Sequence, residues 1–374
     1  MTRKPEVGIG IVGYGVMGRA HAYAYRTAPQ VRQLPVQPRL RAISGRDSNA
    51  VARAAAAYGV EEWTADWREL VERRDVQIVD VCTPPGTHAE IVRAAAAAGK
   101  AIVCEKPLEA SYASAVAAVE AVREARVPNA IGFNYRRLPA VALLERLVGE
   151  GRIGDVLLWR ATWLTDEFLD PEIPFDWRFE RRLGGTTIAD LGSHVVDLAT
   201  WIVGGIEEVA AQSSTFTGER SGRPVAVDEA SSVLARFTGG AAGTFELART
   251  CARRPCDLSI EVNGTRGTLR FDYPRLNELW YGDNSDEPGL YGMRRIRAEH
   301  PTHPYAGDWW PLGQGIGFGS SFVNQAADHL ARWPDGPWEP DLETGLQVQQ
   351  VCEAMERSAA ERRWVSVAEL EQGP

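Results

Sequence analysis

The chain has 374 residues, too many for one ordinary hydrophobic core and about right for two domains. Hydrophobic residues make up 44% and charged residues 24%, a globular composition that argues against a mainly disordered chain. The net charge of −9 argues against a general nucleic-acid binder and against a basic membrane-surface helix.

The cysteines and the apolar runs indicate the compartment. The five cysteines are odd in number and include no C-x-x-C pair, which argues against a disulfide scaffold or a zinc knuckle and favours a reducing cytoplasm. The N-terminal segment lacks the apolar core of a signal peptide, and no run approaches the roughly 20 apolar residues that cross a bilayer. We therefore expect a cytoplasmic protein without a membrane partner.

Short apolar runs alternate with helical runs through the first third of the chain. The expected strands are residues 7–12, 40–43, 77–82, 101–104 and 130–133, and the expected helices are 15–25, 48–58, 87–98 and 111–125. Thr87 is the expected cap of the third helix. This alternation predicts an α/β fold, with a doubly wound parallel sheet forming a dinucleotide-binding Rossmann domain over residues 1–135.

Beyond residue 150, β-branched and aromatic residues alternate. The expected strands are 156–163, 231–237, 243–247, 258–262 and 268–271, so residues 136–374 should form an α+β domain with an open, mostly antiparallel sheet. Two late helices, near 320–332 and 343–361, should pack back on the first domain. Ten of the twelve tryptophans follow residue 150; packing of a sheet face or subunit contact is the favoured explanation, with stacking on a sugar the alternative.

The sequence Gly13-Tyr14-Gly15-Val16-Met17-Gly18 directly follows the first expected strand and opens a helix. In this context the first glycine allows a tight turn, the second lets a pyrophosphate approach the backbone, and the third lets helix and strand pack closely. The turn, including Val16 and Met17, therefore predicts a dinucleotide site; an ordinary glycine-rich turn is the alternative.

The end of the second strand should contact the adenosine ribose, where an acidic residue would favour NAD. This chain has Ser44-Gly45-Arg46-Asp47 instead. Arg46 could hold a 2′-phosphate, while Asp47 could equally cap the next helix. These residues favour NADP slightly.

Two further loops follow strand ends, where α/β sheets bind their ligands. Thr83-Pro84-Pro85 is a stiff loop that could line the nicotinamide, and His88, just after it, could be either structural or near the cofactor. Glu105-Lys106-Pro107 ends the fourth strand and would aim a lysine at the same crevice.

Asp190, His194 and Asp197 have helical i, i+4 and i, i+3 spacing, which would place them on one face. A histidine can take a proton while a carboxylate fixes its tautomer, so the pattern indicates acid–base chemistry. A metal site is not expected, because no further His or Cys cluster accompanies them.

The glycine-rich turn, the Glu105-Lys106-Pro107 turn and the 184–197 segment together resemble the Gfo/Idh/MocA oxidoreductase family. Residues 132–137 and 303–310, with Tyr135, Arg136, His303 and Trp310, most resemble the levoglucosan dehydrogenase-type sugar dehydrogenases. The resemblance implies NAD as the cofactor, against the local signal at Ser44, and assembly into homodimers or homotetramers through the C-terminal sheet.

By this resemblance, Lys106 matches the family's active lysine, and Asp190 and His194 match its acid–base pair. It also implies that Glu105 and Lys106 help to bind the cofactor, and that Lys106, His194 and Asp197 contact substrate. A cis peptide before Pro107 is typical of the motif. Tyr135, Arg136, His303 and Trp310 are candidates for holding the rest of a sugar, with packing or surface charge as the alternative.

These residues predict an NAD(P)-dependent dehydrogenase that transfers a hydride between nicotinamide and a ring secondary alcohol of a sugar, anhydrosugar or cyclitol. His194 would take the hydroxyl proton, Asp190 would orient His194, and Lys106 would stabilise the charge on the same oxygen. Three alternatives remain open at this stage: a biosynthetic keto-sugar reductase, an NAD-dependent glycosidase with transient oxidation at C3, and a non-catalytic sensor of the cofactor.

Overall fold

The structure, a computed structural model, describes residues 4–372. The chain divides into two compact units. Unit 1 holds the residues up to Arg137 together with Gly317–Leu346, and unit 2 holds Leu138–Ile316 together with the residues from Gln347 onward. The predicted second domain, residues 136–374, allowed for late helices that pack back on the first domain. In the structure residues 317–346 belong to unit 1, where their helix packs on the first helix of the chain.

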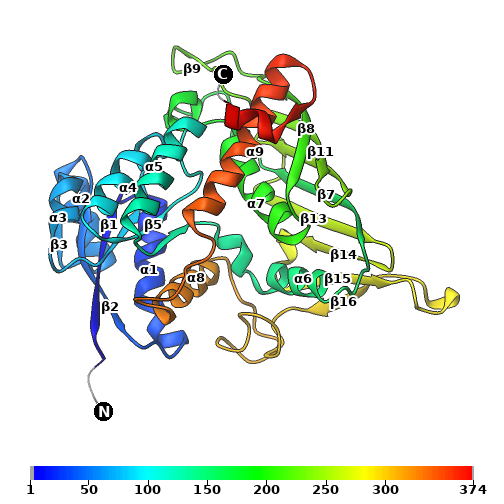
Figure 1. The fold of residues 1–374 in the computed structure, drawn as a ribbon, viewed down its shortest axis with the longest axis horizontal. Coiled ribbons are helices and arrows are strands. Elements are labelled where there is room, and N and C mark those ends of the chain that lie inside the picture. The colour runs from blue at the N-terminus through cyan, green and yellow to red at the C-terminus, as the bar shows by residue number, and fades with distance from the viewer. Residues whose placement is uncertain (1–3, 373–374) are drawn as a thin grey trace. The chain divides into compact units, whose positions relative to one another are not determined.

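Up to residue 137, unit 1 alternates strands and helices, coloured from blue through cyan in Figure 1, and its residues 317–346 are orange. Its strands are β1 (Glu6–Val12), β2 (Gln37–Ser44), β3 (Glu62–Thr64), β4 (Ile78–Val81), β5 (Ala101–Cys104) and β6 (Asn129–Ile131). Its helices are α1 (Val16–Val31), α2 (Ser48–Tyr58), α3 (Trp67–Glu72), α4 (His88–Ala97), α5 (Tyr112–Ala125), α8 (Gly319–Ala331) and the start of α9 (Leu342–Glu361).

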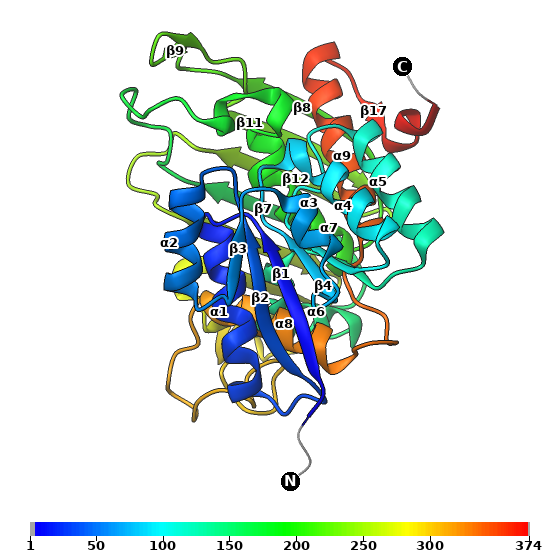
Figure 2. The same cartoon turned by 90° about the vertical axis from the view of Figure 1, so that its left-hand side faces the viewer.

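Within residues 4–372, six parallel strands form the sheet of unit 1 in the order β3-β2-β1-β4-β5-β6. Helix α1 packs against α8, and α4 packs against both α3 and α5, so helices lie on both faces of the sheet (Figure 2). The central strands are buried on both faces, as β4 shows along its full length. This is the predicted doubly wound Rossmann sheet, and its carboxyl edge is the expected ligand edge.

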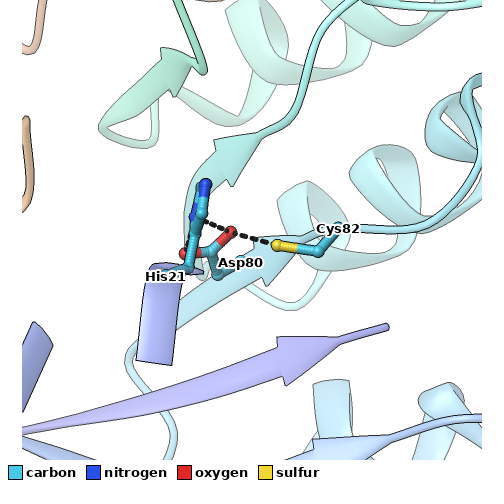
Figure 3. Close-up of side chains that lie close together, drawn as sticks. All are labelled: His21, Asp80 and Cys82. Carbon is cyan, nitrogen blue, oxygen red and sulfur yellow. Dashed lines mark hydrogen bonds and ion pairs between the residues drawn. The ribbon is translucent and has the colours of Figure 1, made fainter. Parts of the chain in front are cut away.

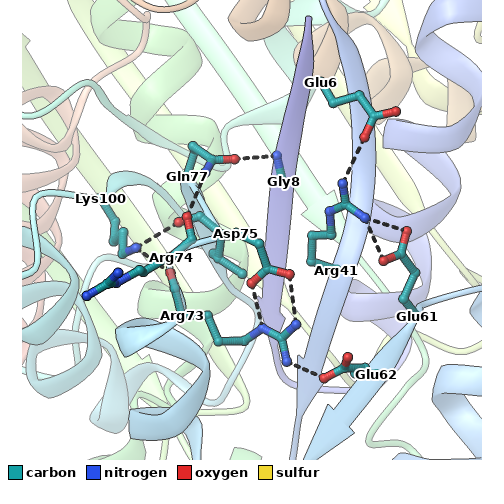
Figure 4. A network of polar contacts seen from close by, with 11 residues as sticks. Glu6, Gly8, Arg41, Glu61, Glu62, Arg73, Arg74, Asp75, Gln77 and Lys100 are labelled. Carbon is teal, nitrogen blue, oxygen red and sulfur yellow. Dashed lines mark hydrogen bonds and ion pairs between the residues drawn. The ribbon is translucent and has the colours of Figure 1, made fainter.

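A network of charged side chains lies near the opposite end of these strands (Figure 4). Arg73 forms two hydrogen bonds to the Asp75 carboxylate, at 2.9 and 2.8 Å, and Arg41 bonds Glu61 and Glu6. Lys100, just before β5, donates to two main-chain carbonyls at 2.6 and 2.8 Å. These contacts tie the starts of the strands together, away from the edge that carries the candidate residues.

Unit 2 is built around a larger sheet (Figure 1). Its strands are β7 (Val156–Leu164), β8 (Ile206–Ser214), β9 (Glu219–Arg220), β10 (Arg223–Pro224), β11 (Ala230–Phe237), β12 (Ala242–Ala248), β13 (Asp257–Gly264), β14 (Gly267–Asp272), β15 (Glu278–Asp283), β16 (Arg294–Arg297) and β17 (Val365–Ser366). Its helices are α6 (Pro139–Gly149), α7 (Ser193–Ile202) and the remainder of α9.

Within the described chain, nine strands make this sheet in the order β16-β15-β14-β13-β7-β12-β11-β8-β17. Only the β7–β12 pair is parallel among these neighbours, which confirms the expected mostly antiparallel sheet. Helix α6 packs on β14 and β15, and α7 packs on β7. Alternate residues of β7, β11 and β12 are buried, while their neighbours, including Leu158 and Leu234, are exposed.

One predicted cap is wrong. Thr87 precedes α4, but its hydroxyl donates to the oxygens of Thr83 and Pro84 instead of accepting from the helix. The caps of α2 and α5, Asp47 and Ser111, do accept helix amides. Over residues 4–372, the structure contains no helix with the length and hydropathy needed to cross a membrane.

Candidate active site

The glycine-rich turn between β1 and α1 is built as its sequence requires. Gly13 has a φ of +114°, and a Cβ there would lie 2.5 Å from the Cys82 carbonyl oxygen. A Cβ on Gly18 would lie 2.1 Å from the Gly13 carbonyl oxygen, so helix and turn need both glycines. A Cβ on Gly15, by contrast, would meet no described heavy atom within 4 Å.

The first turn of α1 is open to an anion. Val16, its first residue, is 65% exposed, Met17 is half-buried, and no described side chain caps this end. None of the residues in this first turn is acidic. A positive helix end beside an open glycine fits the pyrophosphate of a dinucleotide.

The end of β2 lies beside this turn, because the Gly13 amide donates to the Ser44 carbonyl at 2.9 Å. Ser44 is buried, and the Tyr14 ring covers Gly45 so closely that a Cβ there would lie 2.1 Å from it. The Asp47 carboxylate accepts hydrogen bonds from two main-chain amides of α2, both at 2.9 Å. Asp47 is therefore the N-cap of this helix. The Arg46 side chain is exposed.

The Thr83-Pro84-Pro85 loop follows β4 on the other side of the glycine turn. A Cβ on Gly13 would lie 3.1 Å from the Thr83 amide, so the two loops are in contact. Thr83 and Pro84 are half-buried and Pro85 is buried. The geometry therefore brings the predicted cofactor-binding residues of three strand ends together.

His88 supports this loop through hydrogen bonds to the main chain. The ring is fully buried, with Nε2 2.7 Å from the Thr83 carbonyl oxygen and Nδ1 3.1 Å from that of Pro107. It thus joins the loop after β4 to the Lys106-Pro107 turn after β5, whose peptide bond is cis. These contacts favour the structural alternative for His88.

The turn that carries Lys106 is held by the side chain of its neighbour. Glu105 is buried, and its Oε2 accepts the Lys106 amide at 3.1 Å. Its Oε1 lies 2.9 Å from Nε2 of His21, whose Nδ1 lies 2.8 and 3.0 Å from the two oxygens of Asp80 (Figure 3). The Glu105 carboxylate is thereby committed to the protein interior.

The three residues of the second motif lie on one segment of unit 2, but its first part is not an α-helix. Residues Ile188–Gly192 form a π-helix, and α7 starts at Ser193. Asp190 is thus in the π turn, and His194 and Asp197 follow in α7. A π turn changes the angle between i and i+4 side chains and is frequent at functional sites.

Burial of this segment differs from the simple amphipathic picture. The expected apolar side, Leu191, Val195 and Leu198, is buried, yet His194 and Asp197 are also only 6% and 1% exposed. The His194 ring lies 5.2 Å from the Trp163 ring, centroid to centroid. The histidine is therefore held between helix and sheet.

Arg249, which follows β12, is the partner that sequence reasoning missed. Its side chain is fully buried and pairs with the Asp190 carboxylate, while its guanidinium lies 4.6 Å from the centre of the Phe168 ring. A permanent cation beside Asp190 stabilises the ionised carboxylate. The signal was present: residues 243, 245 and 247 alternate inward, and Arg249 continues that register with a charge.

Asp228 fixes the start of the same segment. Its carboxylate accepts the amides of Thr187 at 2.9 Å and Ile188 at 3.3 Å, and Ser231 donates to it at 2.7 Å. A buried carboxylate from a distant loop thus caps the π turn, as a local N-cap would. Because this cap is 40 residues away in sequence, no local pattern could reveal it.

The four residues considered for the rest of the substrate are divided between the units. In unit 1, Tyr135 is buried against Phe318, with ring centroids 5.9 Å apart, and Arg136 is half-buried. In unit 2, Trp310 is 57% exposed and His303 is half-buried, and burial lowers the pKa of His303 below its ordinary value.

Comparison with known families supports the fold and the class of cofactor. Residues 7–133 match the model described as "Oxidoreductase family, NAD-binding Rossmann fold", and residues 141–270 match "GFO/IDH/MocA C-terminal domain". These matches confirm the predicted Rossmann fold and the nicotinamide cofactor, with NAD as the dinucleotide that the model names.

Individual relatives extend over nearly the whole chain. A levoglucosan dehydrogenase of Pseudarthrobacter phenanthrenivorans is 35% identical, over 98% of this chain and 99% of its own. An inositol 2-dehydrogenase of Rhizobium meliloti is 28% identical over 97% of this chain and 99% of its own.

Solved structures give the same result. An oxidoreductase domain protein of Kribbella flavida has a TM-score of 0.94 and 43% identity over 97% of this chain and 99% of its own. A levoglucosan dehydrogenase in complex with NADH and levoglucosan has a TM-score of 0.94 and 36% identity, with the same coverage.

Proposed function

Because the chain belongs to the Gfo/Idh/MocA family of NAD-dependent oxidoreductases, we propose that it oxidises a ring secondary alcohol of levoglucosan or of a related anhydrosugar or cyclitol. One observation carries the proposal. The phosphate-binding turn after β1 and the Lys106 turn after β5 lie at the carboxyl ends of strands in one parallel sheet, where such folds bind their ligands.

The cofactor site uses residues whose geometry fits a dinucleotide. The Gly13, Gly15 and Gly18 turn, with Val16 and Met17, receives the pyrophosphate at the start of α1. The loop of Thr83, Pro84 and Pro85 and the end of β2 line the remainder. His88 and Glu105 support the cofactor site indirectly, because their polar atoms form hydrogen bonds to main-chain groups of the loops that line it.

Three side chains carry the reaction. A bound nicotinamide would supply the hydride acceptor for the carbinol carbon. His194 takes the hydroxyl proton as general base, and Asp190, held ionised by Arg249, orients His194 and stabilises its charged form. Lys106 donates a hydrogen bond to the same oxygen and stabilises its developing negative charge. Asp197, Tyr135, Arg136, His303 and Trp310 are the candidates for the remaining hydroxyls and the ring.

We propose in addition that the protein acts in the cytoplasm as a homodimer or homotetramer formed through the large sheet of unit 2. Two observations support this. Its five cysteines are free thiols, as a reducing compartment requires, and the sheet exposes Leu158 on β7 and Leu234 on β11. These strands lie on either side of β12 in the sheet, and exposed leucines on one sheet face are typical of a surface that another subunit covers.

An absorbance screen tests the substrate. Anhydrosugars, cyclitols and other polyols are offered with NAD and with NADP separately, and formation of the reduced cofactor is followed. We expect turnover with levoglucosan or a close analogue and NAD. Preferential reduction of ketosugars by NADH would favour the biosynthetic reductase, and glycoside cleavage without net NADH would favour the glycosidase; either result would contradict the proposed direction or reaction.

Lys106→Ala tests the catalytic assignment. We expect kcat to fall by about 10³-fold, the scale of lost acid–base and oxyanion stabilisation, while the Kd for NADH changes little. The matched control is Lys100→Ala, which removes a lysine from the other end of β5, where its amine bonds two carbonyls.

The pair of lysine variants is compared by kcat and by NADH binding. If Lys106→Ala retains kcat within a few-fold of the wild type, the assignment is wrong. A double variant with His194→Ala sharpens the test, because two groups acting on one oxygen and its proton should give losses that do not add.

A further inference from the structure

A buried chain of acidic and basic side chains lies at the carboxyl edge of the unit 1 sheet, and Figure 3 shows two of its members, His21 and Asp80. Asp80 on β4, His21 on α1 and Glu105 after β5 are 0%, 3% and 4% exposed. The His21 ring lies between the two carboxylates, at 2.8 Å from Asp80 and 2.9 Å from Glu105. An acidic residue within the apolar run of β4 needs such a partner, because an unpaired buried carboxylate is costly.

The geometry requires both ring nitrogens of His21 to donate. A carboxylate can only accept, so each nitrogen that faces one must carry a proton, and the ring is an imidazolium. Burial by itself lowers the pKa of His21 and is the largest single influence, but electrostatic interactions and hydrogen bonds with Asp80 and Cys82 together hold the pKa well above 6.5. Two carboxylates flanking one cation also leave this buried cluster with a net negative charge.

The same side chains could be taken for a metal site, because ligand atoms of His21, Asp80 and Cys82 lie within 4.8 Å of one another. The hydrogen bonds argue against it. Both ring nitrogens are occupied by carboxylates, and the Cys82 thiol donates to Asp80 at 3.3 Å. A ligand nitrogen must instead present a lone pair to the ion.

The position of Glu105 connects this chain to the active lysine. One carboxylate oxygen bonds His21, and the other accepts the Lys106 amide at 3.1 Å. The Glu105 amide donates to the Val81 carbonyl at 2.9 Å, and a Cβ on Gly132 would lie only 2.9 Å from the carboxylate. The glutamate is thus held from several sides, and His21 lies against its carboxylate as a cationic partner.

We propose that His21 is a positioning residue for Lys106: its imidazolium clamps Glu105 against Asp80 and thereby fixes the backbone from which the active lysine projects. This inference rests on the proposed function of Lys106. It assigns to the first helix of the Rossmann unit a part in catalysis, in addition to the binding of phosphate at its start.

The remaining groups that face the imidazolium are few. Burial and the charge of Asp80 raise the pKa of Tyr25 on α1 and that of Cys82 after β4. Burial and the charge of Glu105 raise the pKa of Cys104 on β5. On α8, burial keeps the pKa of His329 well below 6.5. All of these groups are uncharged near neutral pH, so His21 supplies the positive charge.

His21→Gln tests the clamp, because a glutamine amide cannot donate to two carboxylates on opposite sides. We expect kcat to fall by about 10²-fold, the scale of a small displacement of a catalytic group, with KM and NADH binding changed by less than about threefold. Without the His21 imidazolium, the carboxyl groups of Asp80 and Glu105 have no cation between them, and they repel each other once both are ionised. The kcat of the variant should therefore fall relative to the wild type as pH rises.

Phe322→Leu is the matched control, because the Phe322 ring packs on the other side of His21, with centroids 5.5 Å apart, and its truncation destabilises the same place without changing charge. If the two variants lose kcat in proportion to their loss of melting temperature, with pH profiles like that of the wild type, His21 is merely structural and the proposal is overturned.

A double variant keeps the test decisive if His21→Gln does not fold. In His21→Gln with Glu105→Gln, the glutamine side chains can restore a neutral hydrogen-bonded bridge from Asp80. We expect kcat of the double variant to be at least tenfold higher than that of His21→Gln, or within about tenfold of the wild type if the single variant is unfolded. The pH profile of its kcat should resemble that of the wild type.

The two proposals fail in different ways. A double variant that folds and binds NADH but turns over 10³-fold more slowly than the wild type would overturn the clamp. An inactive Lys106→Ala beside a His21→Gln enzyme that behaves as wild type would overturn the role of His21 alone. An active Lys106→Ala would overturn both.

Discussion

The two units hold their candidate catalytic groups with different kinds of buried charge. In unit 1 a histidine, His21, lies between Asp80 and Glu105 and supports the lysine turn. In unit 2 a guanidinium, Arg249, pairs with Asp190 and supports the histidine helix. A guanidinium stays charged at all pH values that proteins experience, whereas an imidazolium can lose its proton. The pH response of the support should therefore reside in unit 1.

A second difference is what surrounds the pairs. The charges of unit 1 lie among strand ends and helices of a parallel sheet. In unit 2, Arg249 shares the Phe168 ring with another buried arginine, Arg220, whose guanidinium also lies 4.9 Å from the Phe179 ring. Arg220 pairs with the fully buried Glu229 at 3.1 Å. The loops of unit 2 thus depend on permanent charges stacked on aromatic rings, which provide a rigid support.

The largest expected effect on stability comes from Arg220→Met. The change leaves Glu229 buried without its cation, so we expect a loss of about 3–5 kcal/mol in the free energy of unfolding, measured by urea denaturation. The control is Arg223→Met in the same hairpin. Arg223 is mostly exposed where it pairs with Glu180, so its loss should stay below about 1 kcal/mol. Equal losses for the two would show that burial does not distinguish these pairs.

Arg249→Met should have a smaller effect on folding and a clear effect on turnover. The Asp190 side chain is 16% exposed, so water can partly replace the lost partner and the expected loss of stability is about 1–3 kcal/mol. Because Asp190 would orient His194 less well, kcat should fall about tenfold or more, with a pH profile displaced as the carboxylate binds protons more tightly.

The control for this change is Arg254→Met, which removes a half-exposed guanidinium from its pair with Asp257 in the same unit. Its kcat and its stability should stay close to those of the wild type. Should Arg249→Met show an unaltered kcat and pH profile, the assignment of Arg249 as support for Asp190 would be wrong.

Much of unit 1 could be predicted from the sequence, because its information is local. Apolar runs mark strands such as β4, glycines mark the turn after β1, and a parallel sheet then fixes which ends share an edge. The Gly13 turn and the Lys106 turn could thus be placed at the same edge of the sheet from the sequence alone. The short β3 and α3 have no such periodic signal, and Thr87 shows that a suitable residue before a helix can bond elsewhere.

The support of each site could not be predicted as well, because it depends on distant pairings. Asp190 meets Arg249 across 59 residues, and His21 meets Glu105 across 84. A charged residue at an inward position of a strand, such as Asp80 or Arg249, indicates that it has a buried partner, but it does not identify that partner. Only the packing of helices on sheets decides that.

The smallest expected effect tests whether the pH response of unit 1 comes from His21 alone. His329 on α8 is also buried, and its ring stacks on Trp338 with centroids 4.8 Å apart, but burial and then the charge of Arg137 lower its pKa well below 6.5. Below pH 6.5 the unfolded chain therefore binds a proton that the folded chain does not, and stability is lost as pH falls.

His329→Phe keeps the stacked ring and removes this titration. Relative to the variant, the wild type should lose about 1.4 kcal/mol in its free energy of unfolding between pH 7.5 and pH 5.5, as measured by urea denaturation at each pH. The raised pKa of His21 acts in the opposite direction, since its contribution is complete below pH 6.5 and is lost as pH rises through the folded-state value. If the free energies of unfolding of the wild type and of His329→Phe change with pH in parallel, His329 does not titrate on unfolding. If the wild type instead becomes the more stable of the two as pH falls, His329 is charged in the folded protein, as His21 is.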